Sequence, residues 1–168
     1  MPRPSKSEHY LNIAREVAKR CTCFRRKFGA IIVKDDVIVA TGYVGAPRKT
    51  QDCFERGECL RDKMGTPHGQ RYELCRSVHA EQNAIINAAR TGVSLLTGDM
   101  YIWGEDGKGN RIDTFPCFIC KKMIINAGLN KVICSTKNGG MKTFDIQEWV
   151  KDWQEKDILD DRDQYGNE

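Results

Sequence analysis

Hydrophobic residues along the chain follow two spacings, one typical of helices and the other typical of strands. Apolar positions that recur every three or four residues predict amphipathic helices. Four segments show this spacing: residues 7–20, 78–90, 116–127 and 143–156. Shorter runs rich in β-branched and aromatic residues predict strands. These runs are residues 29–34, 37–43, 99–103 and 131–135.

Local signals support several of these boundaries. Ser5, followed three residues later by Glu8, is the pattern of a capping box before the first helix. Asp35-Asp36 separates the first two strand runs, as expected for a β-hairpin. Pro116 opens the third helical segment, where proline is favoured. The alternation of helices and strands predicts an α/β fold with helices on both faces of one mixed sheet.

Two segments depart from these spacings. Residues 44–78 mix glycine, proline, charges and cysteines without periodicity, and so long a loop is unusual inside a compact domain. We expect Cys53, Cys59 and Cys75 to help hold it together. The polar residues from about 157 to 168 are expected to fray. The length otherwise indicates one domain, residues 1–168.

The composition is that of an ordinary globular protein, with 40% hydrophobic and 30% charged residues. The chain has no apolar run of membrane-spanning length and no signal-peptide pattern. We therefore expect a cytoplasmic protein with no membrane partner. In a reducing compartment, its eight cysteines are more readily explained as metal ligands than as disulfides.

The net charge of +4 conceals an asymmetry along the chain. From Asp145 onward there are nine acidic and three basic residues, a balance of −6, so the preceding residues carry +10. A basic body with an acidic end is compatible with an anionic ligand, either a nucleotide or a nucleic acid. A solvated surface without a ligand explains the same charges.

Four residues suggest a catalytic zinc site. His79 and the Cys117-x-x-Cys120 pair are each predicted to open a helix, where unpaired N–H groups and the helix dipole favour a thiolate. Three protein ligands leave one tetrahedral position for water, whose pKa zinc lowers to roughly 7. Glu81 is free to move protons in the same turn as His79. A closed zinc knot of four cysteines and a redox dithiol are the alternatives.

The order His79-Ala80-Glu81, then Pro116-Cys117-x-x-Cys120, resembles the signature of zinc-dependent nucleobase deaminases. Between about residues 10 and 135 the chain is similar to deoxycytidylate (dCMP) deaminases in particular. The stretches that carry this similarity are Thr22-Cys23-x-Arg25-Arg26, Gly29-Ala30-Ile31-Ile32-Val33, Thr41-Gly42-Tyr43-x-Gly45-Ala46-Pro47, Cys53, Cys59-Leu60-Arg61, Glu73-Leu74-Cys75-Arg76, His79-Ala80-Glu81-Gln82-Asn83-Ala84 and Ile124-Ile125-Asn126-Ala127-Gly128. The resemblance implies a three-layer α/β/α cytidine-deaminase-like fold with about five strands.

The resemblance also implies an activity: hydrolytic deamination of dCMP to dUMP and ammonia. Zinc-bound hydroxide would attack C4 of the base, with Glu81 as the proton shuttle. The backbone around Ala80 and Phe115 would contact the base edge. The implied partners are a nucleotide substrate and further copies of the chain in a homo-oligomer.

Three alternatives stay open at this point. The substrate could be a modified or different nucleotide. A nucleic-acid-editing deaminase would need an extended basic groove with aromatic platforms, which the early basic cluster and the acidic end disfavour. A non-catalytic zinc-stabilised binding protein would have no use for the intact Glu81.

A second group of cysteines suggests a structural zinc. Cys23, Cys53, Cys59 and Cys75 surround the irregular segment, and four thiolates form a closed zinc site. Some dCMP deaminases are similar in having a structural zinc here. His68 could replace one of these ligands, and buried thiols without metal are the alternative.

The substrate's phosphate would require a cation. Arg25, Arg26 and Lys27 precede the first strand, and a guanidinium suits phosphate oxygens, with Arg26 the favoured residue. Val44 departs from the family, which usually has asparagine there as a substrate ligand. The glycine-rich stretch at residues 104–111 is a second departure, at the mouth of the pocket or in an oligomer contact.

Overall fold

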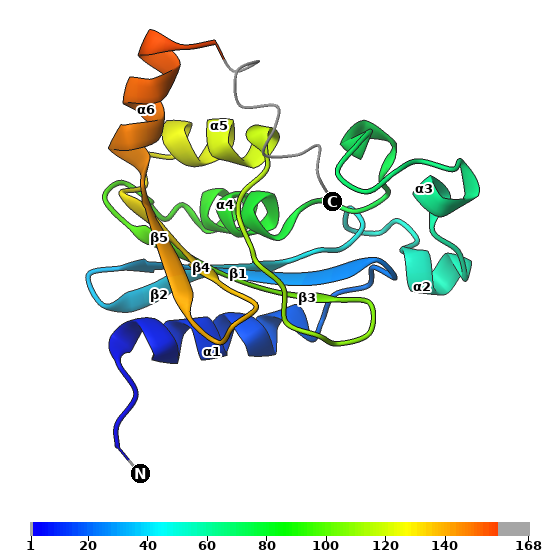
Figure 1. Ribbon diagram of the computed structural model, residues 1–168, viewed down its shortest axis with the longest axis horizontal. Coiled ribbons are helices and arrows are strands. Elements are labelled where there is room, and N and C mark those ends of the chain that lie inside the picture. The colour runs from blue at the N-terminus through cyan, green and yellow to red at the C-terminus, as the bar shows by residue number, and fades with distance from the viewer. Residues whose placement is uncertain (1, 158–168) are drawn as a thin grey trace.

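The computed structural model describes residues 2–157 and contains a five-stranded mixed sheet (Figure 1). The strands are β1 (Arg26–Lys34), β2 (Val37–Tyr43), β3 (Asp99–Asp106), β4 (Lys131–Ser135) and β5 (Met141–Asp145). Their order across the sheet is β2-β1-β3-β4-β5, with β3 and β4 parallel and the other neighbours antiparallel. The helical elements are α1 (Lys6–Ala18), α2 (Cys53–Arg56), α3 (Leu60–Lys63), the 3-10 turn η1 (Tyr72–Leu74), α4 (Ala80–Thr91), α5 (Phe118–Asn126) and α6 (Ile146–Glu155).

The sheet lies between two helical layers, as Figure 1 shows. Helix α1 packs on one face, where Leu11 and Ala14 join Ile31 of β1 in one buried cluster. Helices α4, α5 and α6 cover the other face, and their buried residues form the second cluster with the opposite side chains of the strands. The expected α/β/α arrangement is therefore confirmed. None of the described helices is long and apolar enough to cross a membrane.

Two glycines allow the helices to approach the sheet closely. A Cβ atom at Gly42 of β2 would lie 2.3 Å from Ala80 O and 2.3 Å from Ala84 N of α4. At Gly29 of β1, a Cβ atom would lie 2.1 Å from Ala14 O of α1. Only a residue without a side chain fits between a strand and a helix at these separations. The first turn of α4 therefore packs directly against the sheet.

The prediction of a helix from residue 143 was wrong at its start. Phe144 lies in β5, opposite Val132 of β4, and α6 begins only at Ile146. The side chain of Asp145 accepts a hydrogen bond from Gln147 N and so caps the helix. The strand was not predicted because it is a short, mostly exposed edge strand. In the sequence, Phe144 also continues the apolar spacing of α6, the helix that follows.

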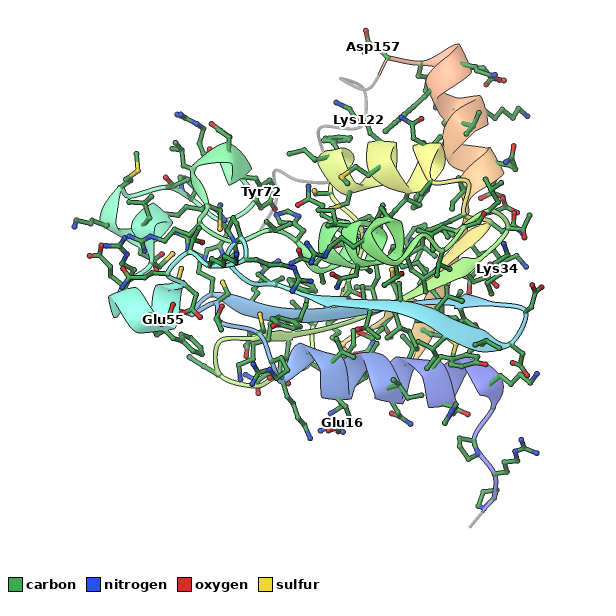
Figure 2. The ribbon with its side chains drawn as sticks, turned by 180° about the vertical axis from the view of Figure 1, so that it is seen from behind. Glu16, Lys34, Glu55, Tyr72, Lys122 and Asp157 are labelled. Atoms are coloured by element: carbon green, nitrogen blue, oxygen red, sulfur yellow. The ribbon has the colours of Figure 1, made fainter. Side chains whose placement is uncertain are left out.

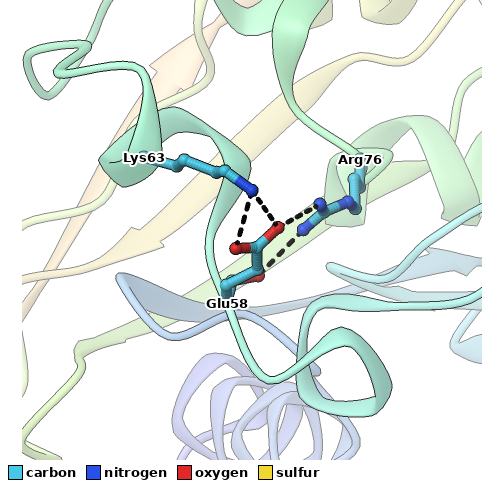
Figure 3. A network of polar contacts seen from close by, with 3 residues as sticks. All are labelled: Glu58, Lys63 and Arg76. Atoms are coloured by element: carbon cyan, nitrogen blue, oxygen red, sulfur yellow. Dashed lines mark hydrogen bonds and ion pairs between the residues drawn. The ribbon is translucent and has the colours of Figure 1, made fainter.

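The segment 44–78 is more ordered than its sequence indicates, because α2, α3 and η1 all lie in it. Polar contacts hold its turns together. Arg76 donates to the carbonyl oxygen of Glu58 at 2.8 Å and to its carboxylate at 3.2 Å, and Lys63 lies 3.3 Å from the same carboxylate (Figure 3). Similarly, β3 extends through the first part of the glycine-rich stretch and ends in a turn at Gly107 to Gly109.

Candidate active site

The predicted zinc ligands lie at the starts of two helices. His79 and Cys117 both have extended backbone conformations and are the residues that immediately precede α4 and α5. The N–H group of His79 donates to the side chain of Gln82 at 3.0 Å, which fixes the entry into α4. Cys120 lies in the first turn of α5. Unpaired N–H groups at both helix starts favour negative charge here.

The three donor side chains converge. Nδ1 of His79 lies 3.5 Å from Sγ of Cys117 and 3.4 Å from Sγ of Cys120. Zinc–sulfur bonds of about 2.3 Å and zinc–nitrogen bonds of about 2.0 Å in a tetrahedron place the ligand atoms roughly 3.5 Å apart. The donor set and its spacing therefore fit zinc. Among the described residues, this is the only group of three or more His, Cys, Asp or Glu donors that lie within 4.8 Å of one another.

Electrostatics favour a thiolate in this group. Hydrogen bonds from Cys120 and His79, together with the positive charge of His79, lower the pKa of Cys117 well below that of a free thiol, although burial opposes the change. A thiolate is the form that binds zinc.

Glu81 lies beside the three donors in the first turn of α4 and is buried, with 7% of its surface exposed. Burial raises the pKa of its carboxyl group, while the positive charge of His79 opposes this shift. A carboxyl group with a raised pKa can accept a proton and then return it near neutral pH.

One cavity contains this site and extends into the 44–78 segment. His79, Glu81 and Cys117 line one part of it. The remaining lining residues are Cys23, Arg25, Arg26, Phe28, Val44, Cys53, Cys59, Arg61, His68, Gly69, Tyr72, Cys75, Ser77, Asp113 and Phe115. Apolar and aromatic walls with a few polar groups are typical of a small-molecule site.

Some of the predicted substrate contacts line this cavity and others do not. Val44 and Phe115 line it. Lys27 pairs with Glu105 at 3.3 Å and is not among the lining residues. Ala80, the first residue of α4, is fully buried and is not among them either.

The two arginines at the start of β1, Arg25 just before it and Arg26 within it, have different roles. Arg26 belongs to β1 and lines the cavity. Arg25 also lines it, but its Nε and Nη2 atoms bind Asp62 and the carbonyl of Thr66, at 2.7 Å each. Arg25 therefore also anchors the 44–78 segment.

The second group of cysteines is brought to the same cavity. Cys23, Cys53, Cys59 and Cys75 all line it, and all are free thiols. Within the described part of the chain, these sulfur atoms do not form a second cluster of three or more donors within 4.8 Å.

Sequence reasoning missed six cavity residues: Phe28, Arg61, Gly69, Tyr72, Ser77 and Asp113. Arg61 carries a usable signal, because it belongs to the Cys59-Leu60-Arg61 stretch that resembles dCMP deaminases. Tyr72 and Ser77 lie in irregular chain, so no periodicity assigns their side chains a direction.

The site combines one histidine, two cysteines and a buried glutamate at two helix starts of a three-layer α/β/α domain. This combination defines the class of zinc-dependent nucleobase deaminases. Residues 4–136 match the profile described as the cytidine and deoxycytidylate deaminase zinc-binding region. The chain belongs to this family, as the sequence motifs indicated.

Curated relatives agree with the family assignment. The deoxycytidylate deaminase of Schizosaccharomyces pombe is 32% identical over 134 residues, which cover 80% of this chain but only 38% of that protein. The deoxycytidylate deaminase of Mycobacterium phage D29 is 33% identical over 138 residues, which cover 79% of this chain and 96% of the phage protein. The chain thus spans less than half of the yeast relative and nearly all of the phage relative.

A solved structure is also similar. The dCMP deaminase of the cyanophage S-TIM5, in complex with dCMP and dUMP, superposes with a TM-score of 0.56 and 26% identity. The match covers 79% of this chain and 82% of the cyanophage chain.

Proposed function

We propose that this chain hydrolyses dCMP to dUMP and ammonia. The observation that carries the proposal is the buried Glu81 beside three zinc donors, in a cavity that arginines also line. The relatives named deoxycytidylate deaminase, and the dCMP and dUMP bound to the cyanophage protein, support the choice of substrate.

The proposed chemistry assigns a task to each part of the cavity. Zinc held by His79, Cys117 and Cys120 would supply a Lewis acid that lowers the pKa of water. Glu81 accepts a proton from the attacking water and passes it to N3 of the base. It then takes the remaining proton of the new C4 hydroxyl group and delivers it to the departing amino group, which leaves as ammonia. The C4–oxygen bond forms and the C4–nitrogen bond breaks. The walls that include Phe115 limit access of other water molecules to the base.

A substrate panel tests this proposal directly. Purified chain with zinc is assayed for ammonia release from dCMP, CMP, dCTP, deoxycytidine and cytidine. We expect the highest kcat/KM with dCMP. Absence of turnover with every pyrimidine nucleotide would overturn the proposed activity.

Val44 bears on the choice of substrate. It lines the cavity with 8% of its surface exposed, and its backbone binds Phe28 O and Thr22 N, at 3.2 Å each. The asparagine usual in the family could hydrogen-bond the substrate, which valine cannot do. A hydrogen bond in a buried site contributes roughly 1–3 kcal/mol, or about tenfold to a hundredfold in rate.

We therefore predict that Val44→Asn raises kcat/KM for dCMP by about tenfold. Steady-state kinetics with dCMP measure the change. Val44→Ala is the matched control, since it enlarges the cavity without adding a polar group and should not raise the rate. If the asparagine variant is no faster with dCMP, the natural substrate carries another group opposite Val44 or another residue supplies the bond.

We also propose a second, structural zinc bound by Cys23, Cys53, Cys59 and Cys75, with His68 as a possible replacement for one thiol. The four cysteines line one cavity, and a closed site there would cross-link the 44–78 segment. We further propose that the chain acts as a homo-oligomer in the cytoplasm, which sedimentation and cell fractionation test.

For the second zinc we expect two zinc ions per wild-type chain by elemental analysis and one in Cys53→Ala. The variant should also unfold at a lower temperature, because metal binding contributes to folding free energy. Cys21→Ala removes a buried thiol that does not line the cavity, so it should keep both ions. A wild-type content of one zinc ion per chain would contradict the second site.

A further inference from the structure

The segment that leads into Cys117 crosses the end of the sheet. It folds back antiparallel to the end of β3, where the N–H group of Ile112 donates to the carbonyl oxygen of Gly104 at 3.2 Å. Two residues later, the N–H group of Thr114 donates to the carbonyl oxygen of Ser135, the last residue of β4, at 3.0 Å. Only two residues then separate Thr114 from the zinc donor Cys117.

The hydroxyl group of Thr114 contacts the ends of two parallel strands. The pairing of β3 with β4 ends at Ile102 and Cys134. At this end of the pairing, Oγ1 of Thr114 lies 3.3 Å from the carbonyl oxygen of Ile102 and 3.0 Å from that of Ser135. A hydroxyl group has one proton, which Thr114 can donate to either oxygen. Because Thr114 is only 5% exposed, this buried contact ties the segment to both strands.

The methyl group of Thr114 is equally well placed, against Gly104 of β3. A Cβ atom at Gly104 would lie 2.6 Å from Cγ2 of Thr114 and 2.5 Å from Cε1 of Phe28, which lines the cavity. The N–H group of Gly104 donates to the hydroxyl group of the fully buried Ser135 at 3.3 Å. Contacts of both the methyl and the hydroxyl group therefore define the position of Thr114.

The two helix starts that carry the zinc donors are supported by different means. The first turn of α4 packs against the sheet, and the ring of Tyr72 meets the ring of His79 edge-on, with the centres 4.8 Å apart. Figure 2 shows Tyr72 between the 44–78 segment and helices α4 and α5. At the start of α5, Cys117 has an extended backbone. The hydrogen bonds of Thr114 link this second helix start to β3 and β4.

We propose that Thr114 is a positioning residue, whose buried hydroxyl group holds Cys117 and the cavity residue Phe115 in the geometry that zinc binding and catalysis require. This inference rests on the proposed deaminase function. A buried hydrogen bond restrains the segment because breaking it would leave polar groups unpaired. Loss of a group that orients a metal ligand typically reduces metal affinity or activity roughly 10- to 100-fold.

Thr114→Val and Thr114→Ser separate the hydroxyl group from the shape of the side chain. Valine keeps the shape and the contact with Gly104, but it cannot donate to Ile102 or Ser135. Serine keeps the donor and loses only the methyl group. We therefore expect the valine variant to lower zinc affinity and kcat for dCMP each about tenfold, and the serine variant to retain wild-type values of both.

Cobalt(II) in place of zinc gives a readout that does not depend on turnover. Thiolate-to-cobalt charge-transfer bands and the visible bands of the ion report the number and geometry of its thiolate ligands. We expect Thr114→Val to shift these bands and Thr114→Ser to match the wild type. Competition with a chelating dye measures the zinc affinity of the same proteins.

Ser135→Ala is the matched control, because it removes a similarly buried hydroxyl group from the same end of the sheet. It leaves the N–H group of Gly104 unpaired, so its loss of stability in urea should be comparable to that of Thr114→Val. Thr114 binds only the backbone carbonyl of Ser135, which alanine retains. The cobalt spectrum and the zinc affinity of this control should therefore equal those of the wild type.

A Thr114→Val protein with the wild-type cobalt spectrum and zinc affinity would overturn the inference. Equal changes in Thr114→Val and Ser135→Ala would also overturn it, since they would reflect lost stability alone. Thr114→Ser supplies the test if valine prevents folding, because a shifted cobalt spectrum with the hydroxyl group retained contradicts the proposed role.

The proposed activity can fail separately from the role of Thr114. An altered metal site in Thr114→Val, with no turnover of dCMP by the wild type, would support the positioning role and overturn the activity. Turnover of dCMP by the wild type, with identical kinetics and metal binding in Thr114→Val, would support the activity and overturn the positioning role.

Discussion

Glu81→Gln should lower kcat for dCMP by at least about 100-fold, and by as much as about 10⁴-fold, the range typical of a general acid–base residue. The amide keeps the size of the side chain but can no longer accept the proton of water and return it to the substrate. Glu81 is buried beside the zinc donors, and it is not needed to complete the His79–Cys117–Cys120 set. Zinc content should therefore stay at the wild-type level.

The matched control for this variant is Asp113→Asn. Asp113 is a second carboxylate of the same cavity, but its side chain is 52% exposed, and it accepts a hydrogen bond from Lys137 N at 2.9 Å. The same chemical change there should cost far less activity. Rapid-quench kinetics and elemental analysis measure both variants. A Glu81→Gln enzyme with an unchanged rate would refute the proton-shuttle role.

The zinc donors were predictable because their arrangement is encoded locally. His79 and Glu81 are two residues apart at a helix start, and Cys117 and Cys120 are three apart at another. Helix geometry alone then fixes which side chains share one end of each helix. That the two helix starts lie next to each other depends on the tertiary fold. Sequence reasoning predicted this proximity only through the resemblance to a known family.

The basic part of the cavity could not be predicted in the same way. Arg25 and Arg61 are far apart in sequence, and their positions depend on the turns of the 44–78 segment. Sequence reasoning placed the phosphate near Arg25, Arg26 and Lys27 because these cations precede the first predicted strand, where the loop of the similar family lines the pocket. The strand alternation of β1 separates neighbouring side chains onto opposite faces, and Lys27 consequently pairs with Glu105 rather than lining the cavity.

The helices and strands with clear apolar periodicity were predictable, whereas the edge strand of the sheet was not. Strong apolar periodicity identified α1, α4 and α5 to within a few residues, and the β-branched runs identified four strands. Strand β5 was not predicted because it is short and mostly exposed. Its hydrogen-bonded pairing with β4 depends on tertiary structure and leaves no clear pattern in the sequence.

Gly42→Ala should impair both stability and catalysis, because Gly42 is where the sheet supports the start of α4. The added methyl group would meet backbone atoms of Ala80 and Ala84 at 2.3 Å, and backbone cannot give way as a flexible side chain can. Overpacking of this kind costs roughly 1–3 kcal/mol, and occasionally more. A shift of α4 would relieve this steric overlap, and α4 carries Glu81 and directly follows His79.

A displacement of about 1 Å at a reacting group can reduce a rate roughly 100-fold. Gly29→Ala separates this effect from simple destabilisation, since its methyl group would meet Ala14 and Ala18 of α1, on the face away from the site. Urea unfolding should show comparable losses of stability for the two variants. Below their unfolding temperatures, kcat per folded molecule and zinc affinity should fall only in Gly42→Ala. Equal kcat values in the two variants would mean that the position of α4 does not control the catalytic geometry.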